Sequence, residues 1–190
     1  MANQIKNISL IFSENPVGRA YLYLFIKKNL ISNEIIYLNQ KTIFNNFFLK
    51  LNHNIVFRNT KKYLKSSNVL TLIRNIEEYF ELDNNFLINM YNFENILKFE
   101  NLKFVNKKDI NNDLNLKFFK DLKENNFLNT SNVIFKNIFN SNKNFYHIHP
   151  GYMYKVRGCD GTLNSINRFN KIGASFFLMD NKIDNGKILS

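Results

Sequence analysis

The start of the chain carries the pattern that most restricts its fold. The run Asn7 to Phe12 (NISLIF) is apolar and rich in β-branched residues, which is typical of a buried strand. Asn15 and Pro16 then form a helix start, with asparagine as the cap and proline at the first helical position, and the helix should reach about Leu30. Glu34 to Leu38 (EIIYL) reads as a second strand. This order predicts an α/β fold of the Rossmann type, a mainly parallel sheet with helices on both faces.

The middle of the chain gives weaker signals. Apolar residues from Val69 to Leu82 follow the three-and-four spacing of a helix, whereas residues 39 to 66 show no clean period. The remaining segments are predicted by shorter patterns: helices over Asn85 to Phe99, Asp113 to Lys123 and Asn132 to Phe139, and strands over Leu102 to Val105 and Asn126 to Leu128.

Length and charge limit the organisation and the partners. The 190 residues contain no linker-like stretch, so we expect a single domain over residues 1 to 190. The net charge of +11 invites a nucleic-acid interpretation, but the lysines are scattered, with Lys61-Lys62 and Lys107-Lys108 among the longest concentrations. The excess of Asn, Lys, Ile and Phe is what AT-rich codons produce. We therefore expect no specific nucleic-acid partner, although an anionic small substrate would benefit from the charge.

The single cysteine and the lack of long apolar runs indicate a reducing compartment and no membrane span. Cys159 cannot form an internal disulfide, which fits reducing conditions. The early apolar residues are interrupted by Ser13 to Pro16, unlike a secretory signal, and no run reaches the ~18 apolar residues that a membrane helix needs. We expect a cytoplasmic protein without a membrane partner. The oligomeric state stays open.

From Phe145 the sequence changes character. Only Gly18 precedes this point, whereas five glycines follow it, beside two histidines. Phe145 to Ile148 reads as a strand that leads into His149, Pro150 and Gly151, a rigid turn at the sheet edge. Sites in open α/β sheets lie beyond the carboxyl ends of strands, and imidazole exchanges protons near neutral pH. His149 is thus either a catalytic residue or a hydrogen-bonded loop histidine, and the spacing alone does not separate the two.

The two histidines also allow a metal interpretation. His147 and His149 share one face of a strand, and Cys159 and Asp160 follow closely, so a zinc site is conceivable. No CxxC or HExxH pattern accompanies them, so we expect no metal.

A second polar motif lies close to the end of the chain. Ile172 to Met179 reads as a strand, Asp180 to Asn185 as a loop, and Gly186 to Leu189 as the start of a further strand. If the strand ends are neighbours, the carboxylate of Asp184 can approach His149 and orient its ring.

These two motifs together resemble the paired signatures of the folate-dependent formyltransferase family. The first signature is Asn-x-His, a short loop and Arg-Gly, which corresponds here to His147 and His149 followed by Arg157-Gly158. The second is a glycine-containing strand, a loop, and an aspartate followed by a small residue and glycine, which corresponds to Asp184-Asn-Gly186. Their order and their separation of about 35 residues match, and the likeness covers roughly residues 145 to 190.

The resemblance implies transfer of a formyl group from 10-formyltetrahydrofolate, on a formyltransferase-like domain. His149 and Asp184 take the catalytic positions, and His147 replaces the family's asparagine, where it would donate a hydrogen bond to the formyl oxygen. Two further groups of residues are implied at the site. The cofactor pocket would be bordered by Asp180, Asn181, Lys182, Ile183, Ile134 and Phe135, and the substrate loop would contain Pro150, Gly151, Arg157 and Gly158.

The acceptor is less determined than the donor. We favour an amine on a nucleotide-linked sugar, because the tRNA-formylating relatives carry an additional C-terminal domain. Relatives often continue beyond the aspartate motif, and a truncation of this domain at its C-terminus stays open. Two alternatives stay open: a formyltetrahydrofolate hydrolase that directs water instead of an amine, and a catalytically decayed paralogue, which His147 and the absence of glycines near Asn129 would suit.

Overall fold

The computed structural model describes residues 8–39, 46–97, 101–153, 155–158 and 160–190. A seven-stranded sheet with the order β3-β2-β1-β4-β5-β6-β7 forms its centre. The strands are β1 (Ile8–Phe12), β2 (Ile31–Asn39), β3 (Asn101–Asn106), β4 (Asn126–Asn129), β5 (Asn144–His149), β6 (Ser175–Leu178) and β7 (Lys187–Ile188). The strands from β3 to β5 pair in parallel, whereas β6 and β7 are antiparallel to their neighbours. The predicted α/β class with a mainly parallel sheet is confirmed.

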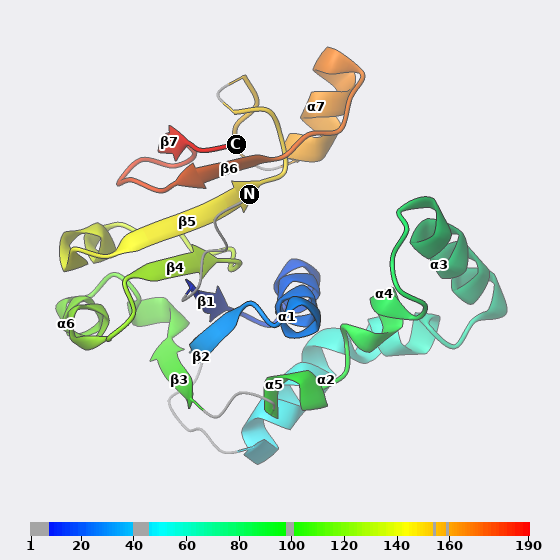
Figure 1. The fold of residues 1–190 in the computed structure, drawn as a ribbon. Coiled ribbons are helices and arrows are strands. Elements are labelled where there is room, and N and C mark those ends of the chain that lie inside the picture. Colours follow the sequence, from blue (N-terminus) through cyan, green and yellow to red (C-terminus); the bar gives the residue numbers. More distant parts are fainter. Residues whose placement is uncertain (1–7, 40–45, 98–100, 154, 159) are drawn as a thin grey trace.

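Helices cover both faces of the sheet (Figure 1). The α-helices are α1 (Pro16–Lys28), α2 (Asn46–Tyr63), α3 (Ser67–Tyr79), α4 (Phe86–Asn89), α5 (Glu94–Leu97), α6 (Asp113–Asp121) and α7 (Gly161–Phe169), and the short 3-10 helices are η1 (Lys107–Asp109) and η2 (Asn137–Ser141). One core joins Phe119 of α6 and Ile138 of η2 to the sheet. On the opposite face, Leu22 of α1 and Leu49 of α2 belong to a second core.

The β1–α1–β2 opening forms as the sequence predicted. The Oδ1 atom of Asn15 accepts a hydrogen bond from the Gly18 amide at 2.7 Å, and Pro16 occupies the first helical turn. This cap satisfies one of the amides that a helix start leaves without a partner. The strand that the sequence placed at Phe145 to Ile148 is β5, which pairs with β4 on one side and β6 on the other. It is therefore an interior strand.

Several helix predictions were wrong. The single helix expected over Asn85 to Phe99 is interrupted, with α4 and α5 as two short helices, and the end of that range lies outside the described residues. The segment from Asn132 is irregular until η2 begins at Asn137. No prediction covered α2 or α7. The buried stripe of α2 includes a histidine, which hides its apolar period, whereas α7 follows Asp160, a residue type common at helix starts that the prediction did not use.

The antiparallel course of β6 has a consequence for the site. Ser175 pairs with His149 and Leu178 pairs with Tyr146, so β6 runs away from the carboxyl edge of β5. The loop that follows β6 therefore starts at the far end of the strand pair. It has to fold back across the sheet face before Asp184 can reach His149.

Among the described residues, no helix combines the length and the apolar character that crossing a bilayer would require.

Candidate active site

Two histidines of β5 form the centre of the candidate site. His147 and His149 alternate with Tyr146 and Ile148 and so point to the same face of the sheet as Phe145. His149 is the last residue of the strand and is 3% exposed. The sequence prediction of a histidine at the carboxyl edge of this strand is therefore correct.

The fold brings Asp184 next to His149. Its Oδ2 atom lies 3.7 Å from Nδ1 of His149, an ion-pair distance longer than an ordinary hydrogen bond of ~3 Å. The same Oδ2 atom accepts a hydrogen bond from the Gly158 amide at 2.8 Å. Both Asp184 and Gly158 have positive φ, at 47° and 78°. The carboxylate is thus held between the strand and the loop that was expected to lie beside the substrate.

The other side of the His149 ring packs against α7. Its Nε2 atom is buried and has no hydrogen-bond partner within the described part of the chain. A Cβ atom on Gly161 would stand 3.0 Å from this nitrogen. The ring is therefore enclosed between Asp184 and the first residue of α7.

His147 makes a different set of contacts. Its Nδ1 atom lies 2.8 Å from the carbonyl oxygen of Asn129, the last residue of β4. Its ring meets Phe177 of β6 edge-on, with 5.8 Å between centroids. Burial lowers the pKa of His147, and the nearby His149 acts in the same direction, whereas the bond to Asn129 and the charge of Asp184 oppose them.

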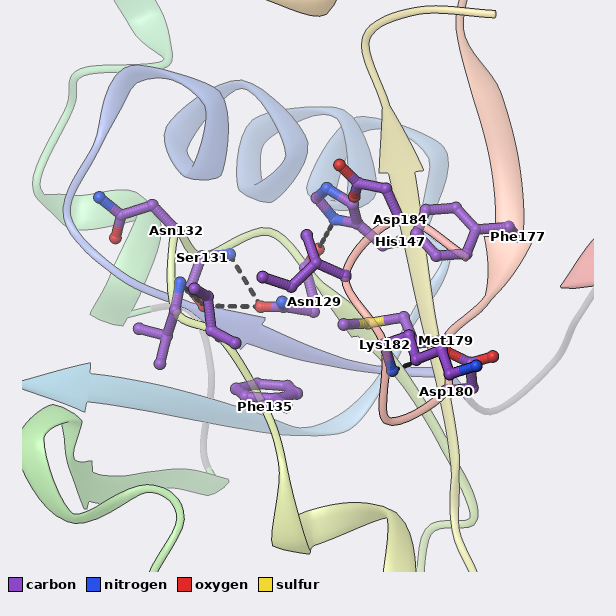
Figure 2. Close-up of a pocket in the computed structure, with 13 residues that line it drawn as sticks. Asn129, Ser131, Asn132, Phe135, His147, Phe177, Met179, Asp180, Lys182 and Asp184 are labelled. Atoms are coloured by element: carbon purple, nitrogen blue, oxygen red, sulfur yellow. Dashed lines mark hydrogen bonds between the residues drawn. The ribbon is translucent and has the colours of Figure 1, made fainter. Parts of the chain in front are cut away.

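A cavity of about 160 Å³ lies beside His147 (Figure 2). Its wall contains His147, Asp184 and five of the six residues predicted for the cofactor pocket: Ile134, Phe135, Asp180, Lys182 and Ile183. The sixth, Asn181, lines an adjoining hollow of about 670 Å³ that shares Ile134, Met179, Asp180 and Ile183 with the first. His149 does not line the cavity. The histidine in contact with this space is His147.

Three polar residues of the cavity wall were missed: Asn129, Ser131 and Asn132. Asn129 ends β4, and its side chain accepts hydrogen bonds from the amide and hydroxyl of Ser131, just beyond the strand. The available signal was their position, since polar residues after a buried parallel strand lie at the edge where sites form.

The residues predicted for the substrate loop separate into two groups. Gly151 is buried: its amide donates to the His149 carbonyl and its carbonyl accepts from the hydroxyl of Ser175. Pro150, Arg157 and Gly158 are exposed. Gly158 contacts a catalytic candidate through a side chain, because its amide donates to the Asp184 carboxylate.

In the described ranges no group of three or more His, Cys, Asp or Glu side chains is arranged to hold a metal ion. Cys159, which the zinc alternative required, lies outside the described residues.

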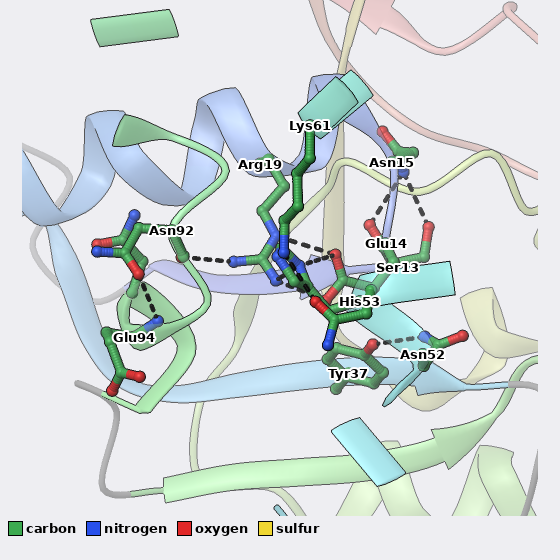
Figure 3. A network of polar contacts seen from close by, with 12 residues as sticks. Ser13, Glu14, Asn15, Arg19, Tyr37, Asn52, His53, Lys61, Asn92 and Glu94 are labelled. Carbon is green, nitrogen blue, oxygen red and sulfur yellow. Dashed lines mark hydrogen bonds and ion pairs between the residues drawn. The ribbon is translucent and has the colours of Figure 1, made fainter. Parts of the chain in front are cut away.

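A separate buried polar cluster lies after β1 (Figure 3). The guanidinium of Arg19 is fully buried and forms a two-pronged contact with the Glu14 carboxylate, at 2.6 and 2.9 Å. It also contacts Nδ1 of His53 in α2 at 2.7 Å and donates to the Asn92 carbonyl at 3.1 Å. This cluster joins α1, α2 and the segment before α5.

Comparison with known proteins identifies the fold of this chain through solved structures. No protein-family profile matches the sequence, and no curated protein matches it significantly. Among solved structures, a sugar N-formyltransferase from a Shewanella species superposes with a TM-score of 0.51 at 17% identity, covering 97% of this chain and 55% of that one. The chain thus spans about half the length of that enzyme.

Two further structures are phosphoribosylglycinamide formyltransferases. The one from Streptococcus pneumoniae gives a TM-score of 0.52 at 9% identity, covering 98% of this chain and 80% of that one. The one from Campylobacter jejuni gives 0.51 at 12% identity, covering 96% and 79%. The chain therefore has a formyltransferase-like fold, as the sequence resemblance implied.

Proposed function

We propose that this chain transfers a formyl group from 10-formyltetrahydrofolate to an amine on a small molecule, an amino sugar carried by a nucleotide. The observation that carries the proposal is that Asp184 and His147 line one cavity, with His149 next to Asp184. The motifs that hold these residues lie about 35 positions apart in the sequence, and the fold around them is formyltransferase-like. The names of the fold neighbours, sugar N-formyltransferase and phosphoribosylglycinamide formyltransferase, support a sugar or a sugar conjugate as acceptor.

The shape of the cavity supports a folate as donor. At about 160 Å³ the cavity is smaller than the ~300–1,000 Å³ of typical ligand sites, so it suits one flat ring system. The adjoining hollow offers space for the rest of an elongated molecule. Phe135 and Ile183 supply apolar wall, and Asn129, Asp180 and Lys182 supply polar groups for the edges of the ring.

We infer the roles of the side chains from their positions. Asp184 lines the cavity, so its carboxylate would accept a hydrogen bond from the attacking amine and orient it. His149 stands behind Asp184 with its Nε2 atom buried, so it would orient the carboxylate instead of contacting the formyl oxygen. This role of His149 is indirect, and it makes Asp184 the more sensitive position.

The test follows the loss of 10-formyltetrahydrofolate with a panel of nucleotide-linked amino sugars, and in parallel with water alone. We expect turnover that requires the amine. We also expect Asp184→Asn to lower kcat by about 10²-fold or more, because the neutral amide lacks the negative charge with which the carboxylate holds the attacking amine. His149→Ala should lower kcat with a smaller change in KM.

The matched control is Asp160→Asn, the same change at the same sheet edge. Asp160 is exposed with φ of 58°, a conformation that asparagine tolerates, so activity and stability should stay at the wild-type level. Turnover without any amine would support the hydrolase. No turnover, together with no folate binding by calorimetry, would replace our proposal with the decayed paralogue.

A further inference from the structure

The hydrogen bond to Asn129 determines which nitrogen of His147 carries a proton. A carbonyl oxygen can only accept, so Nδ1 of His147 must be the donor in the 2.8 Å contact. A neutral imidazole has one N–H, and Nε2 is then left with a lone pair. Within the described part of the chain this second nitrogen has no hydrogen-bond partner, and His147 lines the cavity. The cavity therefore faces an acceptor.

The surroundings of His147 favour the neutral ring. The contacts come from β4 through Asn129, from β6 through the apolar edge of Phe177, and from β5 itself through the nearby His149. The charged groups that share the cavity wall are Asp180, Lys182 and Asp184, all from the loop after β6. Burial is the largest influence and lowers the pKa of His147, although Asp184 opposes it.

We propose that His147 is the proton acceptor of the formyl-transfer reaction, and this role rests on the function proposed above. The amine nitrogen forms a bond to the formyl carbon, and one N–H proton passes to Nε2 of His147. The bond between the formyl carbon and the donor nitrogen then breaks, and that nitrogen receives the proton back from His147. Atoms and charges balance without a further reactant, and Asp184 stabilises the imidazolium while it exists.

This role reverses the one expected from sequence. The family's asparagine can donate a hydrogen bond through its amide, and His147 was expected to imitate it. In the neutral ring the only N–H is already bound to Asn129, so no donor is left for the formyl oxygen. The substitution exchanges a donor for a base.

The tautomer is measurable without turnover. We expect ¹⁵N NMR of the histidine side chains at neutral pH to show for His147 a protonated Nδ1 and an unprotonated Nε2, with the signals assigned by their loss in His147→Asn. A protonated Nε2 on a neutral ring would overturn the proposal, whether or not the protein transfers formyl groups.

The kinetic test distinguishes base from donor. His147→Asn can still donate to the Asn129 carbonyl but cannot take a proton, so kcat should fall by about 10²-fold. In the wild-type protein kcat should fall as the pH drops through the pKa of His147, because the protonated ring cannot accept, and this inflection should vanish in the variant. If His147 is a donor, the variant keeps or exceeds wild-type activity, and wild-type activity rises on acidification.

A failure of the proposed function has its own signature. If the wild-type protein consumes no 10-formyltetrahydrofolate with any amine, the proton-transfer role is overturned with it, even where the NMR experiment finds the expected tautomer. Amine-dependent turnover combined with the opposite tautomer would leave the function standing and remove His147 as its base.

Discussion

At the scale of single residues, Gly161 shows how closely the candidate site is packed. A Cβ atom there would lie 2.1 Å from the Pro150 carbonyl oxygen and 3.0 Å from Nε2 of His149, far inside contact distance. Gly161→Ala must therefore displace the turn after β5. We expect a loss of about 1–3 kcal/mol in the free energy of unfolding, as for other overpacked positions, measured by urea denaturation.

Leu163→Ala is the control for this change. The Leu163 side chain is 60% exposed on the same helix, α7, so its removal should alter the free energy of unfolding by no more than about 0.5 kcal/mol. Equal stability of Gly161→Ala and the wild-type protein would mean that α7 does not pack on His149 in solution.

At the scale of elements, the ion pair of Glu14 and Arg19 holds α2 against α1 and β1. Arg19 is fully buried and also contacts His53 of α2. Glu14→Gln would leave the guanidinium without a counter-charge, which typically costs about 3–5 kcal/mol. We expect a loss of this size in the free energy of unfolding at neutral pH, measured by denaturant titration.

The stabilisation that Glu14 contributes to the fold depends on pH, and its direction follows from the pKa of this carboxyl group. Burial opposes ionisation of Glu14, but His53 and Arg19 outweigh it, so its pKa is lowered below the ordinary 4.5. The stabilisation is therefore complete above about pH 4.5 and is lost as the pH falls through the folded pKa. The exposed pair of Lys27 and Asp83, 3.1 Å apart, is the control, and Asp83→Asn should lower the free energy of unfolding far less than Glu14→Gln, because solvent screens the pair. Similar losses in the two variants would contradict a buried anchor.

At the scale of the whole molecule, the positive charge is less evenly spread than its scattered lysines suggested. Between Glu34 and Glu77 the sequence contains seven Lys or Arg residues and no acidic residue. Much of this segment forms α2, with exposed Lys62 at its end and exposed Lys65 just beyond. We expect weak binding to tRNA that falls steeply between about 50 and 200 mM salt and shows no sequence preference.

The double variant Lys62→Gln and Lys65→Gln should reduce the slope of log K against log salt, measured by fluorescence anisotropy. The same double change at the exposed Lys117 and Lys120 of α6 is the control for net charge. Tight tRNA binding that survives physiological salt would contradict this prediction and would favour a tRNA acceptor.

The sequence by itself determined the elements whose signals are local. Hydrophobic period and the Asn15 cap were enough for β1, α1 and β2, because each depends on residues a few positions apart. The histidine motif likewise placed His149 at the end of its strand. For α2 the same approach failed: its buried stripe consists of Leu49, His53 and Phe57, and His53 is buried only because Arg19 and Glu14 surround it.

Only the tertiary structure decided how the candidate site residues are arranged. The antiparallel pairing of β6 makes the following loop fold back over the sheet, so Asp184 comes between His149 and the cavity. The carbonyl of Asn129 reaches His147 because β4 and β5 are adjacent, a pairing between segments that are 18 residues apart. Motif spacing contains no information on such contacts, since they depend on which strands become neighbours and in which direction each runs.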